Sequence, residues 1–308
     1  MPVNQDMGTR RGRTPSPELG ERKQCIAASL LLLVLGPALS CAAALQFQTL
    51  EAWDRHIEQA KARMSSRLGG GARFLWVDEA PDRAQRARSG EILVAPVNGI
   101  GRIEVPNGLI HDWIGAAFFP HTTIDDIFAT TNKYACYKDF FAPTVIDSKL
   151  LSRNGNESSF SMRWVKKALF VTTVMDADFR ACYLRRSEKA WYGFVWSTRM
   201  QDVVNDGQSS ELKLPPGTGS GFIWRLFSIS RFEERDGGVY VELEAMALSR
   251  SVPAYLKWLV NPAISRLSRS SLVTSLSQTR EAVQSLLQRA GLDSCGSKTG
   301  ALRPHSSQ

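Results

Sequence analysis

Apolar residues recur every three or four positions over residues 49–68, and this spacing is typical of an amphipathic helix. Thr49 is a suitable N-cap, and three consecutive glycines at positions 69–71 end the pattern. The apolar stripe consists of Leu50, Trp53, Ile57, Ala60 and Met64. The charged stretch over residues 78–90 has no such period, and we expect a loop there. Residues 45–90 are therefore predicted to be a helical extension and a linker.

From Glu91 the pattern changes to short apolar runs separated by turn signals, which is typical of β-structure. A helix that opens at Thr122 or Thr123 interrupts the series, with Asp125 and Asp126 in its first turn. The sequence Asp236-Gly237-Gly238 predicts a tight hairpin between the last two strands. The expected strands cover residues 92–94, 103–105, 109–119, 144–152, 157–168, 169–185, 190–204, 221–235 and 239–248.

The last predicted strand alternates acidic and apolar residues. Glu242 and Glu244 are interleaved with Val241, Leu243 and Ala245. Because successive side chains of a strand point to opposite faces, we predict that the glutamates lie on a face exposed to water and the apolar residues on a buried face.

After Pro253 the period becomes helical again, with an interruption expected at Pro262. A long helix is then predicted over residues 271–290, capped by Ser270 or Ser271 and closed by Gly291. Its apolar stripe contains Leu272, Leu276, Val283 and Leu286. An isolated helix of this length is marginal in water, so we expect this stripe to pack against the sheet.

Strands in a meander that end in one long amphipathic helix predict an α+β fold. We expect a curved antiparallel sheet around the C-terminal helix, which is the helix-grip arrangement, over residues 91–291. The Ser-, Gly- and Lys-rich residues 292–308 are predicted to be a disordered tail.

The N-terminal residues 1–44 have the pattern of an export signal. Arginines at positions 10, 11, 13 and 22 precede an apolar run with five leucines and a valine at residues 30–35, and small residues follow. Three readings remain: a cleaved signal peptide, an uncleaved N-terminal anchor, or lipidation at Cys41. The residues before Cys41 depart from the usual lipobox. We expect an exported protein, in the periplasm or anchored in the membrane and facing the periplasm.

The net charge of +8 and the pI of about 9.4 raise nucleic acid and anionic membrane as partners. The basic residues are interspersed with acidic ones, as Arg231 and Arg235 are with Glu233 and Glu234. This mixture favours a solvated surface, so we predict no nucleic-acid partner, whereas membrane association through the N-terminus stays open.

Three cysteines follow residue 44, namely Cys136, Cys182 and Cys295. Cys136 and Cys182 are either a disulfide or two separate thiols. The cysteines and histidines lack zinc-ligand spacing, so we expect no metal and no cofactor.

Four segments carry a resemblance to a known family. They are GLIHDWIGAAFFP (108–120), DSKLLSRNG (147–155), GFIWRLFSISRFEERDGGVYVELEAMALSR (221–250) and WLVNPAISRL (258–267). They resemble an exported bacterial subgroup of START-like proteins, within the class that includes polyketide-cyclase-like and pollen-allergen-like domains (SRPBCC). The resemblance implies an apolar cavity for lipids or other hydrophobic small molecules, and it implies no reaction. The family pattern has two histidines in the first segment, whereas here the second is Asp112.

Candidate chemistry is sparse. His111 and Asp112 suggest a base and its orienting carboxylate, but neighbouring strand residues point to opposite faces. Strand-borne tryptophans either line a pocket or fill the core, and the strand arginines Arg163, Arg199 and Arg225 are expected to face outward. The candidate ligand-binding residues are His111, Trp113, Trp164, Trp196, Trp224 and Leu276.

We therefore predict a non-enzymatic binding protein for a hydrophobic small molecule or lipid. Two alternatives remain: a cyclase- or hydrolase-like enzyme that uses His111 or Asp112 in the same cavity, and a membrane-associated interaction protein. No residue is assigned a catalytic role.

Overall fold

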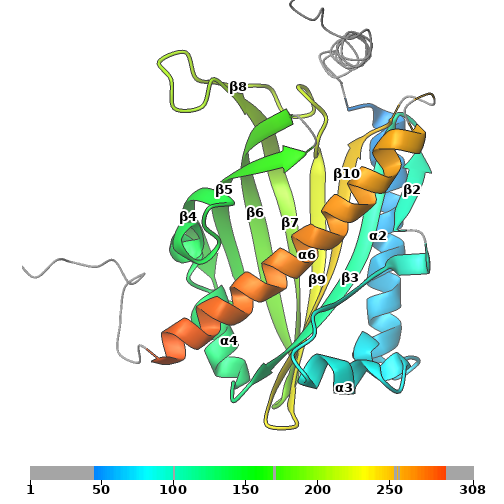
Figure 1. Cartoon of the computed structure of the whole chain (residues 1–308), viewed down its shortest axis with the longest axis vertical. Helices are drawn as coiled ribbons and strands as arrows, with labels where there is room; N and C mark the ends of the chain where they lie inside the picture. The colour runs from blue at the N-terminus through cyan, green and yellow to red at the C-terminus, as the bar shows by residue number, and fades with distance from the viewer. Residues whose placement is uncertain (1–44, 100, 169–170, 253–254, 256, 289–308) are drawn as a thin grey trace, which may run out of the picture. The chain divides into compact units, whose positions relative to one another are not determined.

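A strongly twisted antiparallel sheet is the main element of the fold (Figure 1). The computed structural model describes residues 45–288 except 100, 169–170, 253–254 and 256, so the predicted export segment and C-terminal tail lie outside the described residues. The strands of this part are β1 Leu93–Pro96, β2 Arg102–Val105, β3 Gly108–Pro120, β4 Val145–Asn154, β5 Glu157–Ala168, β6 Val171–Ser187, β7 Ala190–Val204, β8 Leu212–Lys213, β9 Arg225–Arg235 and β10 Gly238–Arg250. They are ordered β1-β3-β10-β9-β7-β6-β5-β4, with β2 added to β3 and β8 to β7.

The hairpin between β9 and β10 has the turn that the sequence predicts. Asp236 and Gly237 have φ of 57° and 79°, so both central residues are left-handed, as a two-residue hairpin of this twist requires. Arg235 pairs with Gly238 across the turn. This register places Arg231 directly opposite Glu242.

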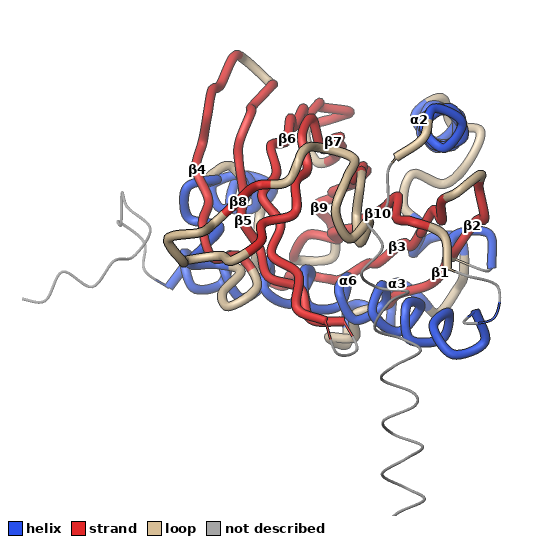
Figure 2. Tube along the Cα trace, turned by 90° about the horizontal axis from the view of Figure 1, so that it is seen from above, coloured by secondary structure: helices blue, strands red, loops and turns tan. Residues whose placement is uncertain are grey.

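Two long helices lie on opposite sides of the sheet, as the view in Figure 2 shows. The helices are α2 Phe47–Leu68, α3 Arg83–Arg88, α4 Ile124–Thr131, α5 Tyr137–Phe140 and α6 Lys257–Gln288, with short 3-10 turns at Trp76–Glu79, Val97–Gly99 and Tyr134–Cys136. Helix α6 crosses β3 and contacts β1, β10, α4 and α5. Below, the face of the sheet toward α6 is the inner face and the face toward α2 is the outer face.

Two local expectations change in the structure, and one choice between neighbouring residues is decided. The stretch predicted to be a loop contains α3, whose residues Arg83–Arg88 are good helix formers and bury Ala87. Helix α6 begins at Lys257 and continues through Pro262, because a proline in the second turn removes only one hydrogen-bond donor from a helix of 32 residues. The cap of α4 is Thr123, in a reciprocal capping box with Asp126.

Strand β3 shows how the two faces are assigned. A Cβ on Gly115 would lie 2.9 Å from Leu276 Cδ1 of α6, so Gly115 faces inward. Asp112 faces outward, where it contacts His56 of α2. The two-residue period of a strand then places His111 on the inner face, opposite to Asp112, as the sequence predicts.

The prediction of a water-exposed face on β10 is wrong. Glu242 and Glu244 are 0% and 5% exposed, whereas Leu243 and Ala245 on the other face are half-buried. The alternation is real, but α2 covers the glutamate face, and Arg231 and Arg63 pair with the two carboxylates. A buried charge is tolerated when it is paired and hydrogen-bonded in this way.

Three apolar clusters follow from this layout. One lies under α2 and contains Trp53, Ile57 and Met64. A second lies under α6 and α4 and contains Leu276, Val283 and Ile127. A third covers the inner side of β5 and β6 around Phe160 and Phe179, together with Tyr134.

Candidate functional site

The middle of the inner face is only partly covered. Val195 of β7, Ser228 of β9 and three residues of β10, Leu243, Ala245 and Ala247, are half-buried although α6 lies on this side of the sheet. All but Leu243 are small, so they leave space where a larger side chain would meet the helix. This surface is the candidate ligand-binding wall.

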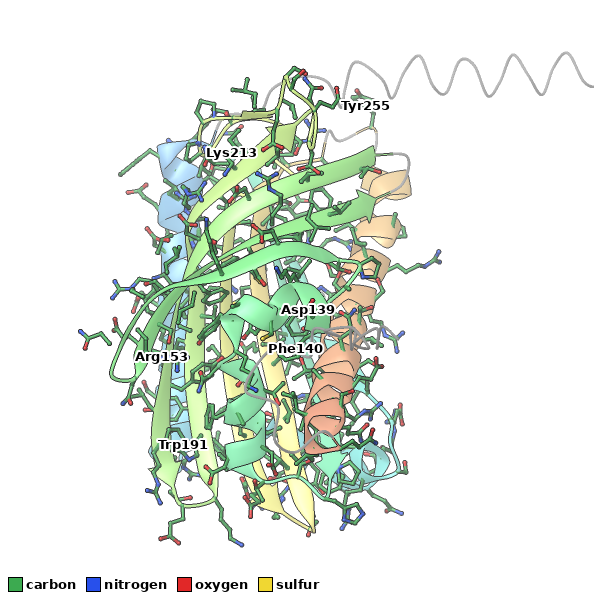
Figure 3. All side chains as sticks on the ribbon, turned by 90° about the vertical axis from the view of Figure 1, so that its left-hand side faces the viewer. Asp139, Phe140, Arg153, Trp191, Lys213 and Tyr255 are labelled. Atoms are coloured by element: carbon green, nitrogen blue, oxygen red, sulfur yellow. The ribbon has the colours of Figure 1, made fainter. Side chains whose placement is uncertain are left out.

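Aromatic side chains close one end of this wall. Trp191, at the lower end of the sheet in Figure 3, lies with its ring centroid 5.0 Å from that of Phe128 on α4. Tyr183 and Phe232 contact the same Phe128 ring, at 5.3 and 5.7 Å. Edge-to-face packing of this kind is favourable beyond the area it buries. These four rings therefore close this end of the wall.

At the other end lies a buried polar pair, His111 and Ser249. His111 Nε2 is 2.9 Å from Ser249 Oγ, and the two residues are 9% and 8% exposed. Burial, with a smaller contribution from the charge of Arg102, lowers the pKa of His111 to about 4. The imidazole is therefore neutral at neutral pH, with its Nε2 in contact with Ser249.

Trp113 and Trp164 also lie on the inner side, but within packed surroundings. A Cβ on Gly101 would lie 2.6 Å from Trp113 Cε2, so the β1–β2 loop covers this indole. Trp164 is 7% exposed and packs against Phe179, with 5.9 Å between ring centroids. Both side chains belong to the packed surroundings of the wall.

Trp196 and Trp224 do not lie on the inner face with His111. Trp196 lies opposite Phe227 in the β7–β9 pairing, and both Trp196 and Trp224 pack with the cluster under α2. The period of β7 correctly groups Trp196 with Phe194, but it does not indicate on which side of the sheet α6 lies. These tryptophans therefore face the outer side.

Leu276 is 2% exposed and packs in the cluster under α6. Its Cδ1 lies over Gly115, a position where only a hydrogen side chain leaves room. Leu276 therefore fixes the distance between the helix and β3.

A buried ionic network under α2 was not predicted. Arg231, 0% exposed, lies 2.9 Å from Glu242 and 3.3 Å from Glu244, and Glu244 also accepts from Arg63 at 2.9 Å. Burial opposes the charge of Arg231, but the two glutamates more than offset it and raise its pKa. The hairpin turn fixes the register that pairs Arg231 with Glu242, so this part of the network was readable from the sequence.

Asp112 extends the network to β3. Its Oδ2 lies 2.9 Å from His56 Nε2 and 3.4 Å from Arg63 Nη2. Burial raises the pKa of this carboxyl, and the hydrogen bond with His56 opposes the shift. Because Asp112 is held on the outer face, it cannot act as the orienting carboxylate of His111.

The structure also places the cysteines and the strand arginines. Cys182 is a free thiol, so no disulfide joins it to Cys136. Arg163, Arg199 and Arg225 lie on the outer face, where the first two pair with Asp176. Within the described residues, no three potential metal-binding side chains gather into a site. None of the helices in that part of the chain is long and apolar enough to span a bilayer.

Comparisons with known proteins give structural neighbours only. No protein-family model matches the sequence, and neither does any curated protein. A STAR-related lipid transfer protein from Xanthomonas axonopodis is 16% identical, with 60% of this chain and 99% of that chain covered and a TM-score of 0.40. The Zhui aromatase/cyclase from Streptomyces sp. R1128 is 9% identical, with 59% and 98% covered and a TM-score of 0.40. Human STARD10 is 10% identical, with 68% and 82% covered and a TM-score of 0.39.

The chain has the helix-grip fold. This statement rests on its own architecture, an open, curved antiparallel sheet with a long C-terminal helix across the inner face and an N-terminal helix on the other side. The predicted α+β class and helix-grip arrangement are thereby confirmed.

Proposed function

We propose that this protein is an exported, non-enzymatic binding protein that holds a hydrophobic small molecule or lipid between α6 and the inner face of the sheet. One observation carries the proposal: apolar and small side chains in the middle of the inner face are half-buried although a helix lies over that side. Ligand sites are mostly apolar and have a few polar groups that fix orientation. Val195, Leu243 and Ala245 supply the apolar surface, and His111 with Ser249 supplies the polar end.

The substitution Ala245→Phe tests the proposal. If the inner face holds open space, the larger ring folds in at little cost and displaces the ligand. If the face is already filled, overpacking lowers the stability by about 1–3 kcal/mol. Native mass spectrometry of the purified full chain detects co-purified ligand, and thermal unfolding separates the two cases. Ser209→Phe, on an exposed loop, is the matched control.

Support for the proposal requires that the parent and Ser209→Phe carry a hydrophobic molecule and that folded Ala245→Phe does not. A parent chain that is ligand-free and gains no mass with added fatty acid, sterol or phospholipid contradicts it.

Export is supported by the basic residues and apolar run within residues 1–44. Fractionation of bacteria that express the full chain, with peptide mapping of the N-terminus, tests this part. We expect the protein outside the cytoplasm, either cleaved near residue 44 or attached to the membrane by the uncleaved or lipidated segment.

A second function rests on the His111–Ser249 pair. An imidazole nitrogen 2.9 Å from a hydroxyl is the arrangement of a base and a nucleophile. The low pKa of His111 leaves the ring unprotonated but also makes it a weak base. Turnover of an ester probe that His111→Gln and Ser249→Ala each abolish, with folding intact, supports an enzyme. Equal turnover in the parent and both variants excludes this pair.

A further inference from the structure

A groove of about 530 Å³ lies on the outer face, beside α2 and across β6, β7 and β9. Its volume is within the range of small-molecule sites. Residues of α2 line it, and α2 and α6 lie on opposite sides of the sheet (Figure 2), so it is separate from the inner-face site. The proposed function does not use it.

The apolar part of the groove is built from α2, β7 and β9. Trp53 and Ile57 are four residues apart on one side of α2, and Phe194 and Trp196 alternate outward on β7. Phe227 of β9 lies with its ring centroid 6.0 Å from that of Phe194. Phe194 and Trp196 stay half-buried, so aromatic surface remains accessible in the groove.

Arg225 contributes a cation to this aromatic surface. It is half-buried, and within the described residues its one hydrogen bond is from Nη1 to the Trp224 carbonyl, at 2.8 Å. Burial lowers its pKa, and the charge of Asp54 at the rim opposes this shift. A guanidinium has five donors, so Arg225 retains donors for an incoming anion.

The acidic residues that line the groove make no hydrogen bond to the Arg225 guanidinium within the described residues. Glu58 is exposed and paired with Lys61 at 2.8 Å, and Glu157 is paired with Arg180. Asp54 is exposed and makes no hydrogen bond to Arg225 within the described residues. The lining thus combines a half-buried cation with carboxylates at the rim, which favours an anion of one charge over a dianion.

We propose that this groove is a second ligand site, which takes an amphiphilic carboxylate. The carboxylate pairs with Arg225, and the apolar body lies on the half-buried rings of Phe194 and Trp196, above the buried Trp53 and Phe227. Aromatic faces supply the apolar contact, and the planar guanidinium matches the two oxygens of a carboxylate.

Cys182 gives a local readout because its free thiol lines the same groove. The full chain is treated with a maleimide, and the modification rate of Cys182 is followed by peptide mass spectrometry with and without dodecanoate. We expect dodecanoate to slow this modification. Dodecanol and dodecyl phosphate should protect Cys182 less, since the first has no charge and the second carries up to two.

Three variants locate the anion. Arg225→Gln should weaken dodecanoate protection by about tenfold or more, the usual value of a charge-assisted hydrogen bond. Asp54→Asn should strengthen protection, because it removes a negative charge near Arg225. Ala245→Phe, which blocks the inner face, should leave protection unchanged, so failure of the inner-face site and of this groove are distinguishable.

Several outcomes overturn the proposal: no protection in the parent, equal protection by dodecanol, or no gain in Asp54→Asn. Equal protection in folded Arg225→Gln also overturns it. If Arg225→Gln does not fold, Asp54→Asn and the comparison with dodecanol decide. If Cys182 is protected without any additive, and this protection increases with protein concentration, a second copy of the chain occupies the groove. This result too overturns the proposal.

Discussion

His56 on α2 and Asp112 on β3 are joined by a hydrogen bond of 2.9 Å whose two side chains are 6% and 1% exposed. This contact attaches the N-terminal helix to the sheet through a polar group inside an otherwise apolar layer. Together with Arg63, it connects to Glu244 and so to Arg231. The helix extension is therefore held by buried charges as well as by its apolar stripe.

Arg231→Met should destabilise the protein by about 3–5 kcal/mol, because it leaves Glu242 and Glu244 buried with less compensating charge. Chemical denaturation monitored by circular dichroism measures the change. In the double variant Arg231→Met/Glu242→Gln, part of the loss should return, since one uncompensated carboxylate is removed.

Arg199→Met is the control for this prediction. Arg199 pairs with Asp176 and Asp178 at a partly exposed site, where an ion pair contributes about 0–1 kcal/mol. If Arg231→Met and Arg199→Met lose the same stability, the buried network does not hold α2.

The low pKa of His111 predicts a pH dependence of stability. The folded imidazole has a pKa of about 4, whereas an unfolded histidine has about 6.5, so the unfolded chain binds more protons between these values. The stability that depends on a neutral His111 is fully present above about pH 6.5 and is lost as the pH falls toward 4. The resulting change in the free energy of unfolding between these two pH limits is about 3 kcal/mol, at 1.36 kcal/mol per pKa unit.

His111→Gln should remove this component, so its unfolding free energy should depend less on pH over that interval. Denaturation at a series of pH values gives the two curves. His121→Asn, at an exposed position with φ of 55°, should keep the parental slope. Parallel curves for the parent and His111→Gln would show that His111 titrates normally in the folded protein.

Leu276→Ala should cost about 2–5 kcal/mol, because it opens a cavity between α6 and β3. Leu276→Asp places a charge in the same apolar site and should prevent folding or ligand retention. Thermal unfolding with native mass spectrometry measures both. Leu287, 40% exposed near the end of the same helix, provides the matched control in Leu287→Ala, which should melt close to the parent. A Leu276→Asp variant that melts with the parent would show that α6 does not grip the sheet.

Thr123→Ala should lower stability by about 1 kcal/mol, because Thr123 caps α4 and exchanges hydrogen bonds with Asp126. Thr274→Ala, at an exposed position of α6, should be neutral or slightly stabilising, since alanine is the better helix former. Urea denaturation of the two variants makes the comparison, and equal midpoints would remove the capping box as a stabilising feature.

The sequence by itself determined features that depend on neighbours along the chain. Asp236-Gly237 specifies a hairpin because both positions need positive φ, and the stripe through Trp53 and Ile57 specifies α2 because its period is helical. The antiparallel meander and the terminal helix then predict the helix-grip arrangement. The opposite orientation of His111 and Asp112 follows from the strand period alone.

Only the tertiary structure decided what covers each face. The same alternation on β10 fits an exposed or a buried glutamate face, and the packing of α2 makes it buried, with Arg231 and Arg63 as partners. The alternation on β7 places Trp196 and Phe194 on the same face. Because α2 packs on that face, both residues line the outer groove and not the inner wall. The two-residue period of a strand shows which of its residues share a face. Which helix or strand covers that face depends on contacts between residues far apart in sequence, such as His56 with Asp112.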